Sequence, residues 1–116
     1  MGLRFAEICV DANDTAALSA WWSHALGWAV EPAEDEGEWL LRAPAGEGPD
    51  WLFLPVPEGK AVKNRIHFDF TPDDQRAEIE RLLGLGARPA DIGQGEQTWV
   101  VLADPEGNEF CILAAG

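Results

Sequence analysis

Ionisable and thiol side chains recur at every second position in three short segments of this 116-residue chain. The positions are Glu7, Cys9 and Asp11 in the first segment, Arg65, His67 and Asp69 in the second, and Glu109 and Cys111 in the third. Imidazole and carboxylate groups together suit Zn²⁺, Mn²⁺, Ni²⁺ or Fe²⁺, and a thiolate would favour Zn²⁺. The same groups can instead form a hydrogen-bonded polar network, so a metal site and a site without metal remain alternatives.

The residues between these positions are apolar, which predicts β-strands with one polar and one apolar face. In residues 64–70, Ile66, Phe68 and Phe70 should face a core covered by a helix. Strand alternation then sends His67 and Asp69 to the opposite, accessible face. The first and third segments follow the same rule.

Around these segments the sequence predicts the order strand, helix, strand, strand, repeated once. The first helix is expected to be capped by Asn13 or Asp14 and to end at Gly27, because such residues favour helix starts and ends. The second helix is expected to start with Thr71 as its cap and Pro72 at its first position, and to end before Gly86. Glu7 precedes Asp14 by seven residues, as His67 precedes Asp74, which indicates an internal repeat.

Composition and charge exclude several partners. Apolar residues make up 47% of the chain, and the formal net charge is −13 with only 8 Lys and Arg. Binding to nucleic acid or to an anionic membrane is therefore not expected, whereas a cationic ligand would be attracted. The chain lacks an apolar run of the ~20 residues that cross a bilayer and lacks a signal-peptide pattern. We expect a cytoplasmic protein in which Cys9 and Cys111 are free thiols.

The chain resembles the vicinal oxygen chelate superfamily, which includes glyoxalase I, extradiol dioxygenases, fosfomycin-resistance enzymes and bleomycin-resistance proteins. The stretches that carry the resemblance, most of all to the small glyoxalase-like domains, are DANDTAALSAWWSHALGW, KNRIHFDF and DPEGNEFCIL. The resemblance implies an α+β fold in which two βαβββ modules form a curved mixed sheet, or half-barrel, with the helices outside. It implies one glyoxalase-like domain over residues 1–116, with module one at about 1–60 and module two at about 61–116, and a homodimer.

The resemblance also implies a divalent metal inside the half-barrel. Glu7 and His67 occupy the ligand positions on the first strand of each module. The family carboxylate, four residues after the glycine of the DPxG turn, is replaced by Cys111, and Glu109 lies two residues earlier on the same strand face. We expect Glu7, His67 and Glu109 to bind metal, His67 and Glu109 to act in catalysis, and Asp69 and Cys111 to contact the substrate. In the alternative without metal, His67 is only hydrogen-bonded, Glu109 braces the turn and Cys111 is a small buried hydrophobe.

Two functions from different classes fit these residues. The first is a glyoxalase-like protein that binds a small oxygenated or aromatic molecule in the half-barrel and acts as a metal-dependent lyase, isomerase or oxygenase. The second is a non-catalytic protein that sequesters a drug, as bleomycin-resistance members do. The shared register of Glu7 and His67 favours the enzyme, whereas Cys111 and the net charge favour sequestration. In either case, three tryptophans are expected to offer flat walls to the ligand: Trp39, Trp51 and Trp99.

Overall fold

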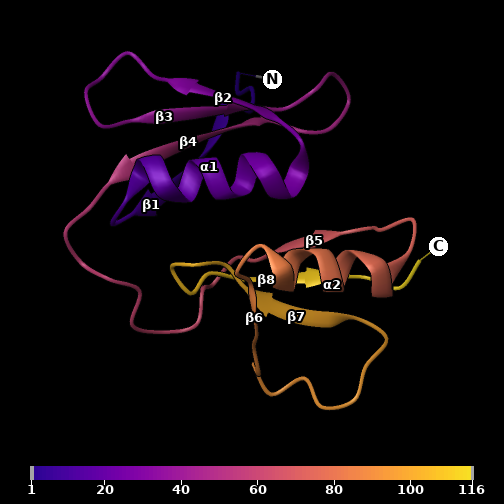
Figure 1. Cartoon of the computed structure of the whole chain (residues 1–116). Coiled ribbons are helices and arrows are strands. Elements are labelled where there is room, and N and C mark those ends of the chain that lie inside the picture. Colours follow the sequence, from indigo (N-terminus) through magenta and orange to yellow (C-terminus); the bar gives the residue numbers. More distant parts are fainter. Residues whose placement is uncertain (1, 116) are drawn as a thin grey trace. The chain divides into compact units, whose positions relative to one another are not determined.

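The computed structural model describes residues 2–115, which divide into two compact units: unit one ends at Gly59 and unit two begins at Lys60. Unit one contains, in order, β1 (Glu7–Ala12), α1 (Thr15–Leu26), β2 (Ala29–Pro32), β3 (Trp39–Arg42) and β4 (Asp50–Pro55) (Figure 1). Unit two contains β5 (Phe68–Phe70), α2 (Gln75–Gly84), β6 (Arg88–Pro89), β7 (Val100–Ala103) and β8 (Glu109–Ile112).

The two units have the same topology. Their sheets have the strand orders β1-β4-β3-β2 and β5-β8-β7-β6, so the first strand of each unit pairs with the last. That pairing is parallel and the other pairings are antiparallel. The expected α+β fold of two βαβββ modules is confirmed, and each mixed sheet is open. The union of the two sheets in a half-barrel stays a prediction.

One strand in each unit does not follow from the residue pattern, although the family resemblance implies it. These strands, β2 and β6, lie at the free edges of their sheets. Both end in a proline, Pro32 and Pro89, which an edge strand tolerates because its outer side needs no donor. The acidic segment that follows β2 begins at Ala33, because Glu31 and Pro32 belong to the strand.

Both helices are capped by an aspartate. The Asp14 side chain accepts a hydrogen bond from the Ala17 N–H at 3.0 Å, and the Asp74 side chain accepts one from the Ala77 N–H at 3.1 Å. The expectation that Thr71 caps the second helix is wrong, because the helix starts a turn later and Asp74 takes the cap position. Gly27 ends α1 with a φ of 73°, a left-handed conformation that glycine adopts without steric cost.

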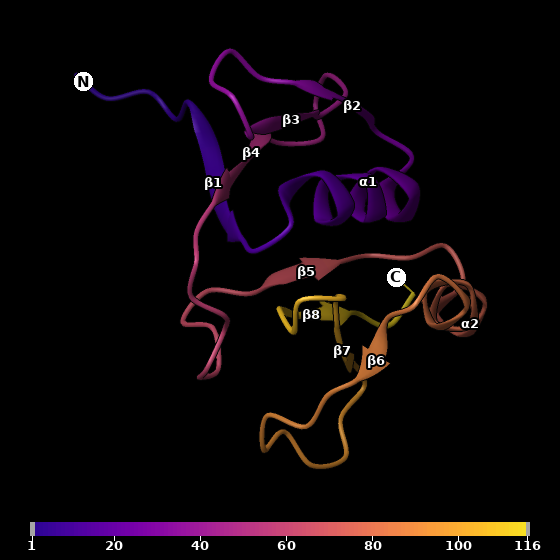
Figure 2. The ribbon, with the colours of Figure 1, turned by 60° about the vertical axis from the view of Figure 1, so that its left-hand side comes forward.

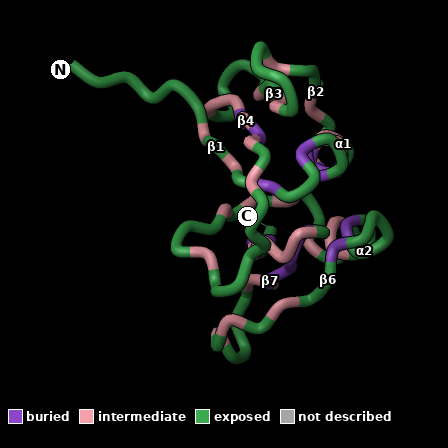
Figure 3. Tube along the Cα trace, turned by 90° about the vertical axis from the view of Figure 1, so that its left-hand side faces the viewer, coloured by how far each residue is buried: buried purple, intermediate pink, exposed green. Residues whose placement is uncertain are grey.

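The core of unit one lies between α1 and one face of its sheet (Figures 1 and 3). The buried side chains of α1 repeat at helical spacing, and they include Leu18, Trp21, Trp22 and Ala25. They meet Leu41, Trp51 and Phe53, which alternate along β3 and β4. Figure 3 shows the segment before β1 as exposed, and Figure 2 shows it running out beyond the sheet.

In unit two, Phe110 and Ile112 of β8 and Leu102 of β7 are buried, as is Leu82 of α2. The expected turn at residues 104–108 forms around the buried Asp104. Its carboxylate accepts hydrogen bonds from the backbone N–H groups of Glu106 at 2.9 Å and Asn108 at 3.0 Å. This turn holds the register of β7 against β8.

The expected strand over residues 64–70 is only partly correct. Strand β5 covers Phe68–Phe70, and Ile66 lies before it with 76% of its surface exposed. The backbone N–H of Asn64 donates to the Glu109 side chain at 2.9 Å instead of joining a strand ladder. Ile66 therefore does not face a helix-covered core, and strand alternation alone does not decide the orientation of His67.

Candidate functional site

One face of the unit-one sheet points away from α1 and carries polar side chains along β1. Along β1 the residues Glu7, Cys9 and Asp11 are exposed, while Ile8 and Val10 are half-buried, which confirms the expected alternation. Cys9 pairs in register with Leu52 of β4, and Leu52 pairs with Leu40 of β3. Residues paired in register share a sheet face, so this face has an apolar centre built from three half-buried leucines: Leu40, Leu52 and Leu54.

Acidic groups surround that apolar centre. Burial raises the pKa of the Cys9 thiol, and the negative charges of Glu7, Asp11 and Glu38 raise it further. A thiol resists losing its proton where the surrounding potential is negative, so the negative potentials of these three carboxylates overlap at the Cys9 thiol. The eleven Asp and Glu residues before Lys60 face only two arginines, which gives unit one a formal net charge of −9. Most of the excess negative charge of the chain therefore belongs to unit one.

Two of the three expected tryptophans lie on the opposite face of the unit-one sheet. The Trp51 ring is buried with its centroid 5.1 Å from the Trp22 ring and 5.9 Å from the Trp28 ring. Trp39 pairs in register with the fully buried Phe53, which places it on the same side as Trp51. Trp51 is thus a core residue of unit one. Trp99 lies directly before β7 in unit two and is half-buried.

Three metal-ligating groups meet in unit two. Asp69 on β5 pairs in register with Cys111 on β8, and the His67 Nε2 atom lies 3.5 Å from an Asp69 carboxylate oxygen. One ligand atom from each of these three side chains lies within 4.8 Å of the other two. Asp69 and Cys111 thus share one sheet face as expected, and His67 joins them from the residue just before the strand. The expected accessibility of that face fails at Cys111, which is buried and pairs in register with the buried Val101.

The Cys111 thiol is almost completely buried, with 1% of the residue exposed. Burial, followed by the charge and hydrogen bond of Asp69, raises its pKa to about 11, although the Lys63 charge opposes the shift. The thiol therefore carries its proton at neutral pH and donates it in a hydrogen bond to Asp69. Cys111 is not a nucleophile in this state.

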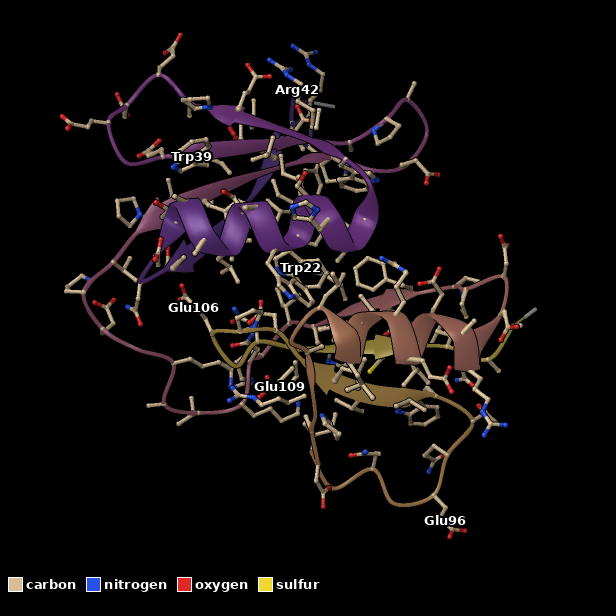
Figure 4. All side chains as sticks on the ribbon, viewed as in Figure 1. Trp22, Trp39, Arg42, Glu96, Glu106 and Glu109 are labelled. Atoms are coloured by element: carbon tan, nitrogen blue, oxygen red, sulfur yellow. The ribbon has the colours of Figure 1, made fainter. Side chains whose placement is uncertain are left out.

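Glu109 is engaged elsewhere. Its Oε2 atom accepts a hydrogen bond from the Lys60 ammonium group at 2.6 Å, and its Oε1 atom accepts one from the Asn64 N–H at 2.9 Å (Figure 4). Burial alone would raise the pKa of this carboxyl, but the hydrogen bonds from Lys60 and Asn64 outweigh it, and the pKa is lowered. Glu109 thus braces the segment that leads into β5.

The donor set implied by the family resemblance does not fit this chain at two of its positions. Both Glu109 oxygens already have partners in unit two, and a protonated Cys111 stands where family members have a carboxylate. Contact of Glu7 with His67 would join the two units and stays a prediction. Sequence reasoning assigned Asp69 to substrate contact and did not group it with His67 and Cys111, whereas the structure brings the three side chains together. The signal for it was the pairing of the first strand with the last, which puts Asp69 opposite Cys111.

Fold and residue placement define an α+β protein built from two βαβββ modules. A family model described as a glyoxalase-like domain matches residues 7–113, and the chain belongs to that family. No curated protein sequence matches the chain significantly. In the part of the chain that the structure describes, no helix has the length and apolar character needed to cross a membrane.

Several solved structures share the fold of this chain. The fosfomycin resistance protein FosX from Mesorhizobium loti matches with a TM-score of 0.72 at 15% identity, over 100% of this chain and 94% of that one. A glyoxalase/bleomycin resistance protein/dioxygenase family enzyme from Burkholderia phytofirmans matches with 0.68 at 18% identity, over 92% and 94%. The antibiotic-binding protein TnmS3 from Streptomyces sp. CB03234 matches with 0.65 at 17% identity, over 100% and 99%. These likenesses show the fold alone, and the glyoxalase-like family model is what confirms the family resemblance.

Proposed function

We propose that this protein binds a small organic cation with a flat or aliphatic body and holds it without chemical change. The observation that carries the proposal is the face of the unit-one sheet that points away from α1. It combines an apolar centre at Leu40, Leu52 and Leu54 with the carboxylates that raise the Cys9 pKa. We call it the acidic face.

The chemistry of the acidic face matches that ligand class. Half-buried leucines on a sheet can cover the apolar body of a ligand, while carboxylates at the rim attract its positive charge. The formal net charge of −9 before Lys60 strengthens that attraction at low salt. A neutral sugar or an anionic phosphate would gain nothing from this potential.

Two features of unit two support binding over catalysis. The side chain at the family carboxylate position is the protonated thiol of Cys111, which cannot act as a general base at neutral pH. Glu109, the nearest carboxylate on the same strand, is neutralised by Lys60. One structural neighbour, TnmS3, is named an antibiotic-binding protein, and that role is consistent with the proposal.

A titration with two flat dyes tests the proposal. Proflavine, a cation, should bind the full chain, and 8-anilinonaphthalene-1-sulfonate, an anion, should bind far more weakly. The three variants that remove one charge each from the acidic face are Glu7→Gln, Asp11→Asn and Glu38→Gln. Each should weaken proflavine binding about twofold to fivefold, the effect of one partly exposed charge.

The control for this titration is Glu96→Gln, which makes the same charge change on an exposed loop of unit two. It should leave proflavine affinity within about twofold of the parent chain. Equal binding of both dyes, or equal losses in Glu96→Gln and the acidic-face variants, would contradict a specific acidic face.

A second candidate is a metal-dependent lyase, isomerase or oxygenase. The observation in its favour is the His67 imidazole, which keeps the family position and lies 3.5 Å from a carboxylate. Oxygen uptake with catechol, or loss of the hemithioacetal of methylglyoxal, measured with and without EDTA, separates it from the first candidate. Turnover that EDTA abolishes would favour the enzyme.

A further inference from the structure

The carboxylates on and beside the acidic face differ in whether they have partners. Glu31 accepts a hydrogen bond from the Arg42 guanidinium group, and one Asp50 oxygen lies 3.9 Å from the same group. The other Asp50 oxygen accepts a hydrogen bond from the Ala43 N–H at 2.8 Å. Among the residues that the structure describes, no ion pair or hydrogen bond holds the side chains of the remaining three: Glu7, Asp11 and Glu38.

These three open carboxylates mark two ends of the face. Glu7 and Asp11 lie four residues apart on one face of β1, and a rise of about 3.3 Å per residue separates their Cα atoms by about 13 Å. Asp11 pairs in register with Leu54, and the register of β3 with β4, continued by one residue, puts Glu38 on the other side of Leu54. The Ala33 N–H donates to the Glu38 carbonyl at 2.9 Å, so the β2–β3 ladder reaches this residue. We call the two ends the Glu7 pole and the Asp11–Glu38 pole.

The sheet surface between the two poles is apolar. Leu52 lies in the middle, where it pairs in register with Cys9 on one side and with Leu40 on the other. Both leucines are half-buried, so part of their surface is free to cover a ligand. An elongated apolar body can therefore lie along β1 and β4 with one end at each pole.

We propose that the acidic face selects organic dications whose two positive groups are joined by an apolar chain or flat body and stand about 13 Å apart, the separation of the two poles along β1. This inference rests on the proposed function and specifies the ligand class of the same face.

The two poles explain why a second charge matters. A monocation neutralises one pole and leaves the other in contact with water alone. A dication of matching length reaches both, and its second contact forms within the complex, at the high effective concentration that a short link provides. A dication that is too short to reach both poles gains little over a monocation.

This selectivity does not reuse the metal ligands that the family resemblance implies. Asp11 and Glu38 lie outside that set, and Glu7 acts here through its charge on an organic group. The rival explanation is diffuse attraction by the net negative charge of unit one. Diffuse attraction favours every dication over every monocation, whatever the spacing of the charges, so spacing is the property to test.

Isothermal titration calorimetry of the full chain at low salt, with three quaternary ammonium compounds, tests the proposal. Decamethonium carries two trimethylammonium groups at a spacing close to that of the poles. Hexamethonium carries the same groups on a shorter chain, and hexyltrimethylammonium carries only one. We expect decamethonium to bind about fivefold more tightly than either, the effect of one further partly exposed charge. Added salt should reduce this preference, because it screens both poles.

Matched variants show whether the two poles act together. Glu7→Gln removes one pole, and the double variant Asp11→Asn/Glu38→Gln removes the other. Each should reduce the preference for decamethonium over hexamethonium to within about twofold, because neither variant offers a second contact. Glu96→Gln, which makes the same charge change on an exposed loop of unit two, should keep the full preference.

The outcomes separate this inference from the function on which it rests. Equal affinities for decamethonium and hexamethonium, with hexyltrimethylammonium still bound, would overturn the dication inference and leave the proposed function standing. A preference for decamethonium that persists in full in Glu7→Gln would also overturn it, because chain length and not the second pole would then set the affinity. If none of the three compounds and no proflavine binds at millimolar concentration, the inference and the proposed function fail together.

Discussion

Asp14 and Asp74 hold the same position in the two units: each is the N-cap of its helix and accepts a hydrogen bond from the N–H three residues further on. Asp14 follows Glu7 by seven residues, and Asp74 follows His67 by seven; Glu7 and His67 are the expected metal ligands of their modules. The repeat is therefore a repeat of structural roles, in which an aspartate fixes the start of the helix after the first strand.

Replacing either cap with alanine should destabilise the protein. Asp14→Ala and Asp74→Ala each leave helix N–H groups without an acceptor, and the expected loss is about 0.5–2 kcal/mol in the free energy of unfolding. Urea denaturation followed by circular dichroism measures it. Thr71→Ala is the control, because Thr71 is exposed and lies outside α2. A loss at Thr71 equal to that at Asp74 would contradict the assignment of the cap.

The ion pair of Lys60 with Glu109 predicts a pH dependence of stability. The pKa of Glu109 is lower in the folded protein than in the unfolded chain, so the carboxylate favours the folded state at pH above the unfolded pKa of ~4.3. This contribution is lost as the pH falls through the lowered pKa. Glu109→Gln should cost about 1.5–3 kcal/mol at pH 7, the range for hydrogen bonds to charged groups.

Urea denaturation of the parent chain and Glu109→Gln at pH 7, 5 and 3 checks this dependence. The difference in unfolding free energy between them should shrink toward pH 3. A Lys60→Met variant and the double variant complete a thermodynamic cycle for the pair. A difference that stays constant from pH 7 to pH 3 would show that Glu109 contributes by packing and not by its charge.

Sequence reasoning succeeded where one strand face was clearly apolar. The alternation of Glu7, Cys9 and Asp11 with Ile8 and Val10 predicted their faces, because period-two patterning is a direct consequence of strand geometry. The helix end at Gly27 was predicted for a similar local reason, since its positive φ favours glycine.

It failed where the decision depended on distant partners. Residues 51–55 are apolar on both strand faces, so the pattern could not tell that Trp51 faces α1 while Leu52 faces away. Ile66 was assigned to the core by alternation, but the strand starts after it, at Phe68, and the Asn64 backbone N–H donates to the Glu109 side chain instead of to a neighbouring strand. The role of Glu109 required Lys60, which lies 49 residues away in the sequence.

The position of Trp51 gives a prediction that separates packing from binding. Trp51→Ala should cost about 3–5 kcal/mol, the usual range for truncating a large core aromatic. Trp39→Ala should cost less, because Trp39 is only half-buried. Trp51→Phe, which keeps the fold, should bind proflavine as the parent chain does, since Trp51 faces away from the acidic face. A tenfold loss of proflavine affinity in Trp51→Phe would place the ligand on the α1 side of the sheet.

The two cysteines should react with iodoacetamide at very different rates. Cys9 is exposed and Cys111 is buried, with a pKa raised to about 11, so the native protein should be alkylated once, at Cys9. Cys111 should react only when the chain unfolds in urea. Burial and the charges of Glu7, Asp11 and Glu38 raise the pKa of Cys9 as well, which lowers its thiolate fraction at pH 8.

Glu7→Gln should therefore speed the alkylation of Cys9, because removing a negative charge lowers the pKa of the thiol. Adding 1 M salt to the parent chain should have the same effect, since it screens the carboxylates. Mass spectrometry of the labelled protein at timed intervals gives both rates, with Glu96→Gln as the control for net charge. If Glu7→Gln and Glu96→Gln react at the rate of the parent chain, the carboxylates do not act together on Cys9, and the acidic face loses its electrostatic basis.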